Sequence, residues 1–432
     1  MPSDALVDAL ADYTDELDAA DAELSLPDWL RDRLATATVV GLGEATHGTH
    51  EFARLKHQFL QYLATETDLD ALCLEAGFAE TLALDQYVTD GEGTAREALE
   101  SLRGWSWAVE EVHSLVEWLR EVNADRPRAE RIRLSGLDAQ YTETAVAELR
   151  SFLQRVDLDQ FDAIREDLRQ VDDGGTLTRS GPGHSQLVDA ADRIVEALRT
   201  CFRANRARYV AATSAEQFRI ASRCIDHIEH AVAFKDAVRA LRGGVTDAEA
   251  TARCLRRRDR AMASTVEWAR ERHPRVAIWA HNAHITRSGQ SAADGAVQVP
   301  SLGSRLADHS ADGYLSVGFA LGRGTFRAVT EIVEPSEPRH VRRLERHTRD
   351  SPAEGSIEAA LAAVGYPVCA LDVRAARADD RLTAWLADAR EQFSVGATYD
   401  GSSAESPTKY APGEAFDVLC YADRTTATQP LA

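Results

Sequence analysis

The segment ATVVGLGEATHGTHEF, residues 37–52, reads as a strand, a tight turn and the beginning of a helix. Its three glycines permit the unusual backbone angles that a tight turn needs. Glu44 and His47 lie in this turn, where the predicted strand ends. Ligands bind at the carboxyl ends of strands in an open parallel sheet, so the segment predicts a site as well as a corner of the fold. Helix capping by Thr46 or Thr49 also fits the segment, but it does not explain Glu44 and His47.

Short apolar runs alternate with helical patterns over much of the rest of the chain. Continuous apolar runs are typical of parallel strands that are covered on both faces. Strands are predicted at residues 37–44, 70–78, 131–138, 275–282, 313–321, 366–373 and 416–423, and helices at 51–66, 80–89 and 112–123. This alternation predicts an α/β core with a mainly parallel sheet.

Strand patterns disappear between residues 141 and 272. Long helical patterns replace them at residues 142–171, 185–208, 214–241 and 247–272, and a flexible, glycine-containing connection is predicted at 172–182. We therefore predict three parts: residues 1–140 as the first part of the α/β core with the catalytic strand ends, 141–272 as a helical insertion, and 273–432 as the second part of the core together with a smaller α+β portion. Residues 400–412, DGSSAESPTKYAP, are predicted to form a loop.

The chain of 432 residues carries a formal net charge of −21, from 70 acidic against 49 basic residues. Only three of the basic residues are lysines, namely Lys56, Lys235 and Lys409. An acidic, lysine-poor surface is typical of proteins from salt-loving microbes, and an ordinary acidic protein is the alternative. Nucleic acid is not expected as a partner, because no basic stripe is present to meet phosphates.

No apolar run approaches the roughly 18 residues that a membrane span needs, so a membrane is not expected as a partner. The N-terminal segment is acidic and lacks the basic and apolar parts of a secretory signal, which favours a cytoplasmic location. The six cysteines form no CxxC pair and most lie in apolar patterns, which favours buried, reduced thiols over disulfides or a zinc ribbon. The sequence predicts no particular oligomeric state.

Titratable side chains also end two further predicted strands. Glu75 closes the second strand, where a charge is costly unless it is paired. His281 and His284 follow the fourth strand in WAHNAHI, together with Asn282. Because strand ends meet at one edge of a doubly wound sheet, we expect a cluster of two carboxylates and three imidazoles there. Such a cluster supports proton transfer to and from water near neutral pH.

Other polar segments and motifs are less specific. Arg258 lies in RRRDRAM, where one arginine could turn inward and hold an anion. The spacing of His227 and His230 suits a metal ion, but they lie in the helical insertion without a partner, so a metal site is not expected there. HExxH, GxSxG and Walker A motifs are absent, and the sequence therefore does not support zincin, serine-hydrolase or nucleotide-binding functions.

Several of these motifs, in this order and approximate spacing, resemble the erythromycin esterase family. The matching segments are GLGEATHGTHEF, CLEAGF, GWSWAVEEVHSLVEWLREVN, LSGLDAQ, RRRDRAMASTVEW and VAIWAHNAHI, and the resemblance runs from about residue 35 to the closing FDVLCYADRTTATQP. It implies a three-layer α/β/α core with a mainly parallel sheet, a long-helix insertion and a smaller C-terminal α+β portion. It also implies a hydrolase that cleaves an ester or a lactone of a small molecule without an obligatory cofactor.

The resemblance also implies roles for individual residues. His47 would be the general base that activates a water molecule held between Glu44 and Glu75. Arg258, His281 or His284 would meet the developing oxyanion. The implied residues are Glu44, His47, Glu75, Arg258, His281 and His284 for catalysis, and Lys56, Trp107, Asp138 and Asn282 for substrate binding.

Two alternatives to this function stay open from the sequence. The same glutamates and histidines could hold a divalent metal ion, which would lower the pKa of a bound water toward roughly 7. The chain could instead be a non-catalytic or biosynthetic relative that binds a polyketide or a sugar ester without hydrolysing it, although the complete set of site residues favours an enzyme. The substrate could be a macrolide, another ester, a lactone or an acylated sugar.

Overall fold

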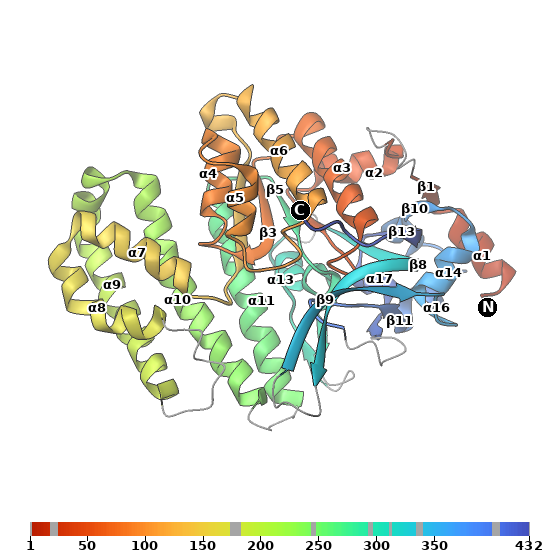
Figure 1. The fold of residues 1–432 in the computed structure, drawn as a ribbon. Coiled ribbons are helices and arrows are strands. Elements are labelled where there is room, and N and C mark those ends of the chain that lie inside the picture. The colour runs from red at the N-terminus through yellow and green to blue at the C-terminus, as the bar shows by residue number, and fades with distance from the viewer. Residues whose placement is uncertain are drawn as a thin grey trace.

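The computed structural model describes residues 2–17, 25–172, 183–242, 248–292, 297–310, 313–333, 340–399 and 407–431. Within these ranges a central sheet carries helices on both faces, and a block of long helices stands at one side of it (Figure 1). The predicted mixed α/β fold with a mainly parallel sheet is confirmed.

The sheet formed by the described residues has nine strands in the order β1-β10-β13-β8-β2-β5-β3-β4, with β9 paired to β8. Neighbouring strands from β13 to β4 are parallel, whereas β1, β10 and β9 pair antiparallel with their neighbours. The strands are β1 (Thr14–Glu16), β2 (Val39–Leu42), β3 (Ala71–Gly77), β4 (Arg133–Asp138), β5 (Val276–Trp279), β8 (Tyr314–Val333), β9 (His340–Arg349), β10 (Val368–Leu371) and β13 (Val418–Thr425).

The register of the central strands aligns their carboxyl ends. Trp279 at the end of β5 pairs with Leu42 at the end of β2 and with Leu74 in β3. The three strands therefore reach the carboxyl edge of the sheet at the same level. Polar residues that follow these positions leave the sheet side by side.

Alternate residues of the central strands face two separate apolar clusters, one on each side of the sheet. Along β3, Leu72 and Leu74 join one cluster and Cys73 joins the other. Burial on both faces explains the continuous apolar runs in the sequence. The first cluster includes residues of α2 (Asp28–Thr36), α3 (His50–Glu66), α4 (Leu82–Asp90), α5 (Ala95–Glu100) and α6 (Glu110–Ala124), and the second includes residues of α1 (Asp4–Ala11), α11 (Ala248–Arg270), α13 (Leu302–His309), α14 (Ile357–Val364) and α16 (Thr383–Ala387).

The helical block has an apolar cluster of its own and is linked to the sheet through α11. It comprises α7 (Glu143–Val156), α8 (Leu158–Asp172), α9 (Gly183–Ala212) and α10 (Ala215–Arg242). Helix α11 packs on both α10 and β4. The single helix predicted at 142–171 is wrong, because Asp157 ends α7 and its carboxylate accepts a hydrogen bond from the Gln160 N–H of α8 at 3.2 Å. The connection predicted after Asp172 lies outside the described residues.

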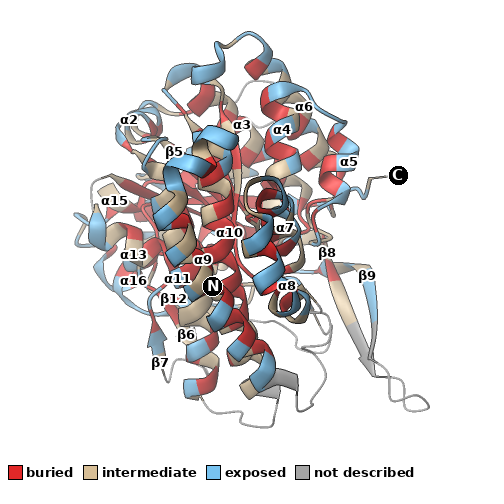
Figure 2. Ribbon diagram, turned by 90° about the vertical axis from the view of Figure 1, so that its left-hand side faces the viewer, coloured by how far each residue is buried: buried red, intermediate tan, exposed pale blue. Residues whose placement is uncertain are grey.

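The hairpin of β8 and β9 projects from the body of the molecule (Figure 2). The strand predicted at 313–321 is too short, since β8 continues to Val333, and β9 was not predicted because HVRRLERHTR contains no apolar run. Of the loop predicted at 400–412, residues 400–406 lie outside the described ranges, and the rest forms β12 and the start of α17. The remaining elements are η1 (Arg128–Glu130), β6 (Gln290–Ala292), β7 (Val297–Val299), α12 (Asn282–Ile285), α15 (Val373–Ala376), β11 (Arg390–Phe393), β12 (Pro407–Tyr410) and α17 (Pro412–Ala415).

Two predictions from composition can be compared with the fold. None of the helices in the described ranges combines the length and the hydropathy needed to cross a membrane. All six cysteines are free, and all but Cys201 are buried, as the apolar patterns around them predicted.

Candidate functional site

The carboxyl edge of the sheet brings the predicted catalytic residues together. Glu44 and His47 follow β2, Glu75 lies near the end of β3, and His281 and His284 follow β5. Their side chains are largely buried: 14% of the His47 side chain and 6% of the Glu44 side chain are exposed. The contacts divide into one group centred on Glu44 and another centred on Glu75.

Glu44 binds three side chains in the first group. Its Oε1 accepts a hydrogen bond from Nδ1 of His47 at 2.6 Å, and its Oε2 accepts from Nε1 of Trp279 at 3.1 Å and from Nζ of Lys56. The Lys56 ammonium also lies 3.8 Å from the centre of the Trp279 ring, a cation–π contact. Burial alone would raise the pKa of Glu44, but Lys56 and His47 outweigh burial and lower it. Glu44 is therefore ionised at neutral pH.

His47 has one bound and one free ring nitrogen. Because a carboxylate only accepts hydrogen bonds, the proton between the two groups belongs to Nδ1, and Nε2 of the neutral ring carries the lone pair. Nε2 makes no hydrogen bond within the described part of the chain. Burial alone would lower the pKa of His47, but the hydrogen bond to Glu44 and the charge of Glu75 outweigh burial and raise it. Glu44 thus fixes the orientation of a ring whose basic nitrogen is available to water.

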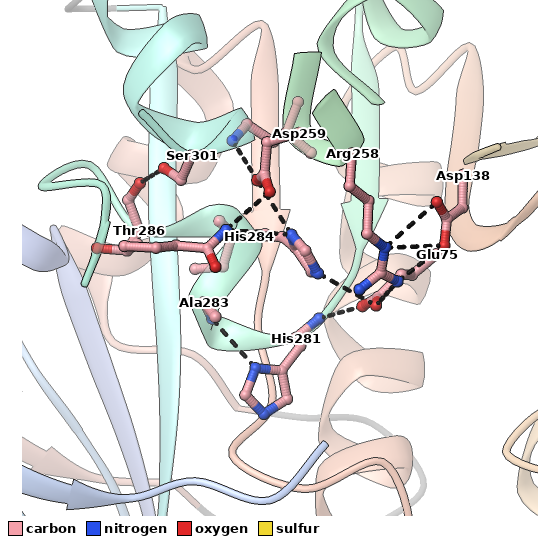
Figure 3. Close-up of polar contacts among 12 residues, drawn as sticks. Glu75, Asp138, Arg258, Asp259, His281, Ala283, His284, Thr286 and Ser301 are labelled. Atoms are coloured by element: carbon pink, nitrogen blue, oxygen red, sulfur yellow. Dashed lines mark hydrogen bonds and ion pairs between the residues drawn. The ribbon is translucent and has the colours of Figure 1, made fainter. Parts of the chain in front are cut away.

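Glu75 is the centre of the second group (Figure 3). Its Oε1 accepts a hydrogen bond from Nη2 of Arg258 at 2.7 Å and lies 3.3 Å from Nε2 of His284, while its Oε2 accepts from the backbone N–H of His281 at 2.7 Å. Arg258 also binds Asp138, through Nη2 at 2.8 Å and Nε at 3.2 Å. Burial alone would raise the pKa of Glu75, but His284 and Arg258 hold it well below its usual range. Glu75 is therefore an ionised carboxylate with both oxygens occupied.

Asp259 belongs to this second group but was not predicted as a site residue. It is fully buried, and its Oδ1 accepts hydrogen bonds from Nδ1 of His284 at 3.0 Å and from the Leu302 N–H at 2.7 Å (Figure 3). Its Oδ2 accepts from Nε2 of Gln290 at 2.8 Å. Asp259 and Glu75 therefore hold the His284 ring from opposite sides. The feature of the sequence that could have indicated Asp259 as a site residue is that it is the single carboxylate in the arginine-rich segment RRRDRAM.

We expect His284 to stay positively charged well above neutral pH. Burial alone would lower its pKa, but Asp259 and Glu75 outweigh burial and raise the pKa to about 10. The unfolded-state pKa of histidine is about 6.5. The stabilisation from protonated His284 is therefore fully present below about pH 6.5 and is lost as the pH rises through about 10.

Urea unfolding at several pH values checks this expectation. The free energies of unfolding of the wild type and the His284→Gln variant should differ most below about pH 6.5, where protonated His284 contributes fully. The difference should shrink as the pH approaches the folded pKa of about 10. A difference that does not change with pH would show that His284 is neutral in the folded protein.

His281 is held as a neutral ring. Its Nδ1 accepts a hydrogen bond from the Ala283 N–H at 3.2 Å, and its Nε2 lies 3.3 Å from the carbonyl oxygen of Ala45. Burial and the nearby His47 lower the pKa of His281 to about 4. The rings of His281 and His47 meet edge-on, with their centroids 5.3 Å apart. His281 therefore supports the position of His47, with both of its own ring nitrogens engaged.

The four predicted substrate-binding residues are buried, and their observed contacts are with the protein. Asn282 is hydrogen-bonded to the backbone of β8. Its Nδ2 donates to the Phe319 carbonyl at 2.7 Å, and its Oδ1 accepts from the Phe319 N–H at 3.1 Å. Lys56, Trp107 and Asp138 are 0%, 6% and 3% exposed. Contact of these residues with a substrate stays a prediction.

The observed pairing of charges suits a metal ion poorly. Among the described residues, no three His, Cys, Asp or Glu side chains are grouped so that they could hold one. Glu44 and Glu75 are instead paired with the cations Lys56 and Arg258. In the insertion, Nε2 of His227 is bound to the Tyr141 carbonyl oxygen at 2.7 Å. The metal-dependent alternative stays open and is tested below.

A cavity of about 810 Å³ lies apart from this cluster, between α4, β4 and the helical block. Glu80 and Thr144 line it near the carboxyl edge of the sheet, and Arg133 and His273 line it at the opposite edge. Arg133 is already paired with Asp85 at 2.5 Å. The lining does not include Glu44, His47, Glu75, His281 or His284, so this cavity is not assigned to the predicted chemistry of that cluster.

The fold and the site together define an α/β protein with a buried, ion-paired cluster of carboxylates and imidazoles at the carboxyl edge of its sheet. The sequence profile of the erythromycin esterase family matches residues 64–425. The chain belongs to the erythromycin esterase family, as the resemblance of its motifs predicted. The matched region begins after Glu44 and His47, so their place in the site rests on the geometry described above.

Individual relatives are distant in sequence but cover between 78% and 99% of this chain. Erythromycin esterase type II of Escherichia coli is 24% identical over 351 residues, which are 78% of this chain and 80% of that protein. A Bacillus cereus protein of known crystal structure has a TM-score of 0.80 at 21% identity, covering 99% of this chain and 100% of that one. The erythromycin esterase EreC, solved as a mutant in its open conformation, has a TM-score of 0.70 at 18% identity, covering 94% and 95%. These structures support the fold, and the family indicates a hydrolase.

Proposed function

We propose that this protein hydrolyses an ester or a lactone with a water molecule activated by His47. The observation that carries the proposal is the state of the His47 ring: Nδ1 is bound to ionised Glu44 at 2.6 Å, and Nε2 makes no hydrogen bond within the described residues. A ring fixed in this way has the orientation and the free lone pair that a general base needs. Its raised pKa favours uptake of the proton.

The proposed reaction has two proton transfers, both through His47. Nε2 takes a proton from water as the water oxygen bonds to the carbonyl carbon, and the carbonyl oxygen becomes an oxyanion. Glu44 stabilises the imidazolium that forms, through its hydrogen bond from Nδ1. The tetrahedral intermediate then collapses, the bond to the alcohol oxygen breaks, and that oxygen receives the proton from Nε2.

Arg258 is the best-placed candidate for stabilising the oxyanion. Of the three candidates, His281 and His284 have both ring nitrogens engaged by protein groups. The Arg258 side chain is 21% exposed, and its Nη1 makes no hydrogen bond among the described residues. A donor that meets the oxyanion contributes about 3–4 kcal/mol to transition-state stabilisation.

The position of the water that the resemblance implies, between Glu44 and Glu75, stays a prediction. Both oxygens of Glu44 and both oxygens of Glu75 are bonded to protein donors. Because a carboxylate oxygen can accept more than one hydrogen bond, a water between the two carboxylates is compatible with these contacts. To lose its proton to His47, this water must also reach the free Nε2 of the ring.

Mass spectrometry of purified protein tests the proposed function. Erythromycin and a panel of aryl esters, lactones and acylated sugars are incubated with the wild type and with His47→Ala, in molar KCl and at low salt. Hydrolysis of at least one compound by the wild type alone is expected: a lactone gains the mass of one water, whereas an acyclic ester is split into an acid and an alcohol. Binding without turnover by the wild type would favour the non-catalytic or biosynthetic alternative.

Chelation tests the metal-dependent alternative with the same substrate. Because the two carboxylates are paired with Lys56 and Arg258, turnover is expected to survive exhaustive dialysis against a chelator. Loss of turnover that one divalent ion restores would instead assign the activation of water to a metal. Unfolding measured in parallel separates loss of a catalytic ion from loss of the fold.

A further inference from the structure

Lys235 lies on the same side of the site as Arg258, although the proposed reaction does not use it. Ala231, one turn before Lys235 on α10, packs against Ala139 and Ala261. Ala139 directly follows the last residue of β4, and Ala261 lies three residues after Arg258 on α11. These contacts place Lys235 near the end of β4.

The direction of the two helices supports this placement (Figure 1). Arg223 of α10 donates to Thr265 of α11 at 2.6 Å, and Ala231, further along α10, meets Ala261, which is earlier in α11. Helices α10 and α11 therefore run antiparallel. Because the helices are antiparallel, Lys235, which follows Ala231 on α10, and Arg258, which precedes Ala261 on α11, lie in the same direction from the contact of the two alanines.

The ammonium of Lys235 is buried without a partner. Its Nζ is shielded from solvent and makes no hydrogen bond within the described residues. The charges that act on it most are those of Glu143 and Arg103, but Glu143 is already bound to Arg103 at 3.2 Å. Burial lowers the pKa of Lys235, and Glu143 opposes that effect. A buried ammonium without a partner is costly, and an incoming anion would offset that cost.

Lys235, Arg103 and Tyr141 together form what we call the outer rim. The Arg103 guanidinium stacks over the Tyr141 ring, 4.7 Å from its centre. Tyr141 is 41% exposed, one of the few exposed large apolar side chains among the described residues. Tyr141 lies three residues after Asp138, which binds Arg258. Arg103 is itself paired with Glu143 at 3.2 Å and with Glu80 at 3.6 Å, so the rim offers a planar aromatic surface and one cation unpaired within the described residues, Lys235, beside the ion-paired cluster.

We propose that the outer rim binds a carboxylate of the substrate, and hence that the natural substrate is an ester or a lactone that also carries an acid group. This inference rests on the proposed hydrolase function and specifies its substrate class. An incoming carboxylate gives the Lys235 ammonium its missing partner through a charge-assisted hydrogen bond. The aromatic face of Tyr141 covers the apolar part of the same molecule.

Binding to the inactive His47→Ala protein tests the rim without turnover. Benzoate and benzamide have the same shape and differ in charge, and their affinities are measured by ligand-observed NMR. The parent is expected to prefer benzoate, and adding Lys235→Met should weaken benzoate binding by about 10- to 100-fold, the usual effect of losing a hydrogen bond between charged groups. Benzoate binding that Lys235→Met does not change, or a parent without preference for benzoate, overturns the proposal.

Turnover by the otherwise native protein gives a second readout. The probes are p-nitrophenyl hemisuccinate, which is anionic, and p-nitrophenyl butyrate, which is neutral. Lys235→Met should lower the ratio of kcat/KM for the anionic to the neutral ester by about 10- to 100-fold, mainly through KM. If the protein hydrolyses neither ester nor any compound of the wider panel, but still loses benzoate binding on Lys235→Met, the hydrolase function fails while acid binding at the outer rim is supported.

Lys409→Met is the matched control, because Lys409 is 63% exposed and its partner Glu391 lies 3.9 Å away. It should change neither benzoate affinity nor the ester ratio. Lys235→Met should raise the melting temperature in the absence of ligand, because it removes an uncompensated buried ammonium. A fall in melting temperature would assign Lys235 a structural partner and count against the rim. Lys235→Gln repeats each measurement in case the methionine variant folds poorly.

Discussion

Replacing His47 by alanine is expected to lower kcat by about 10²- to 10⁴-fold, the usual contribution of a positioned general base. The variant removes the imidazole of the Glu44 group, while Glu44 keeps its contacts with Lys56 and Trp279. The fold should therefore survive, and KM should change little. Steady-state kinetics on an ester that the wild type turns over measure the effect. Activity within a few-fold of the wild type would reject His47 as the base.

His50 supplies the matched control for this variant. It lies one turn further along the same segment, where its Nδ1 is bound to Glu111 at 2.7 Å and its side chain is 37% exposed. His50→Asn should leave kcat within about two-fold of the wild type, since surface substitutions away from a site have small effects. Equal losses in both variants would indicate a structural effect on the segment.

The pH profile gives an independent check on the pairing of Glu44 with His47. A general base must be neutral, so kcat/KM should rise with pH through the pKa of His47, which lies above its usual value. Glu44→Gln removes a charge that raises this pKa. The rising limb of the profile should therefore move to lower pH in the variant, while the maximal rate falls. An unmoved limb would assign the titration to another group.

The largest effect on stability is expected for Glu75→Gln, at about 3–5 kcal/mol of lost unfolding free energy. Glu75 is the shared partner of Arg258 and His284, and it also accepts from the His281 N–H. The side chains of Glu75 and His284 are 6% and 5% exposed, so water cannot replace the lost charge. Two buried cations would then be left with one partner fewer, although Asp138 and Asp259 remain bound to them.

Denaturant unfolding of this variant should be compared with Glu391→Gln. Glu391 is 43% exposed and lies 3.9 Å from Lys409, so losing its charge should cost less than about 1 kcal/mol. The stabilisation by Glu75 should also fall in acid, because its pKa is lowered in the folded state and the contribution is lost as the pH drops through that value. A loss as small as that of the Glu391 variant would show that Glu75 is not the centre of the ion-paired cluster.

Local patterns in the sequence determined which residues stand at the carboxyl edge of the sheet. The glycines around Glu44 and His47 marked a turn after a strand, and apolar runs before Glu75 and His281 marked two more strands. Parallel strands place such ends at one edge, which is why these residues could be predicted together. The β9 strand could not be predicted, because its arginine-rich segment is held by pairing with β8 and not by an apolar pattern of its own.

Only the tertiary structure decided what each side chain does at that edge. Lys56 lies in α3, twelve residues after Glu44 in the chain, yet its ammonium donates a hydrogen bond to Glu44. Asp259 faces His284 because α11 packs on β4, a contact between segments distant in the chain. Asn282, which follows β5, binds the backbone of Phe319 in β8, and these two segments are also distant in the chain.

The physical cause of this division is the range of the interactions involved. Strand, turn and helix patterns reflect the chain's local preference and the need to bury apolar residues, and both are visible in a short window of sequence. The pairing of charges depends on packing between segments that are distant in the chain. Such packing excludes water and brings several cations into contact with one carboxylate. In this protein, the sequence therefore determined which titratable residues stand at the carboxyl edge of the sheet. The packing of α3 and α11 decided that His47 keeps a free nitrogen while His284 does not.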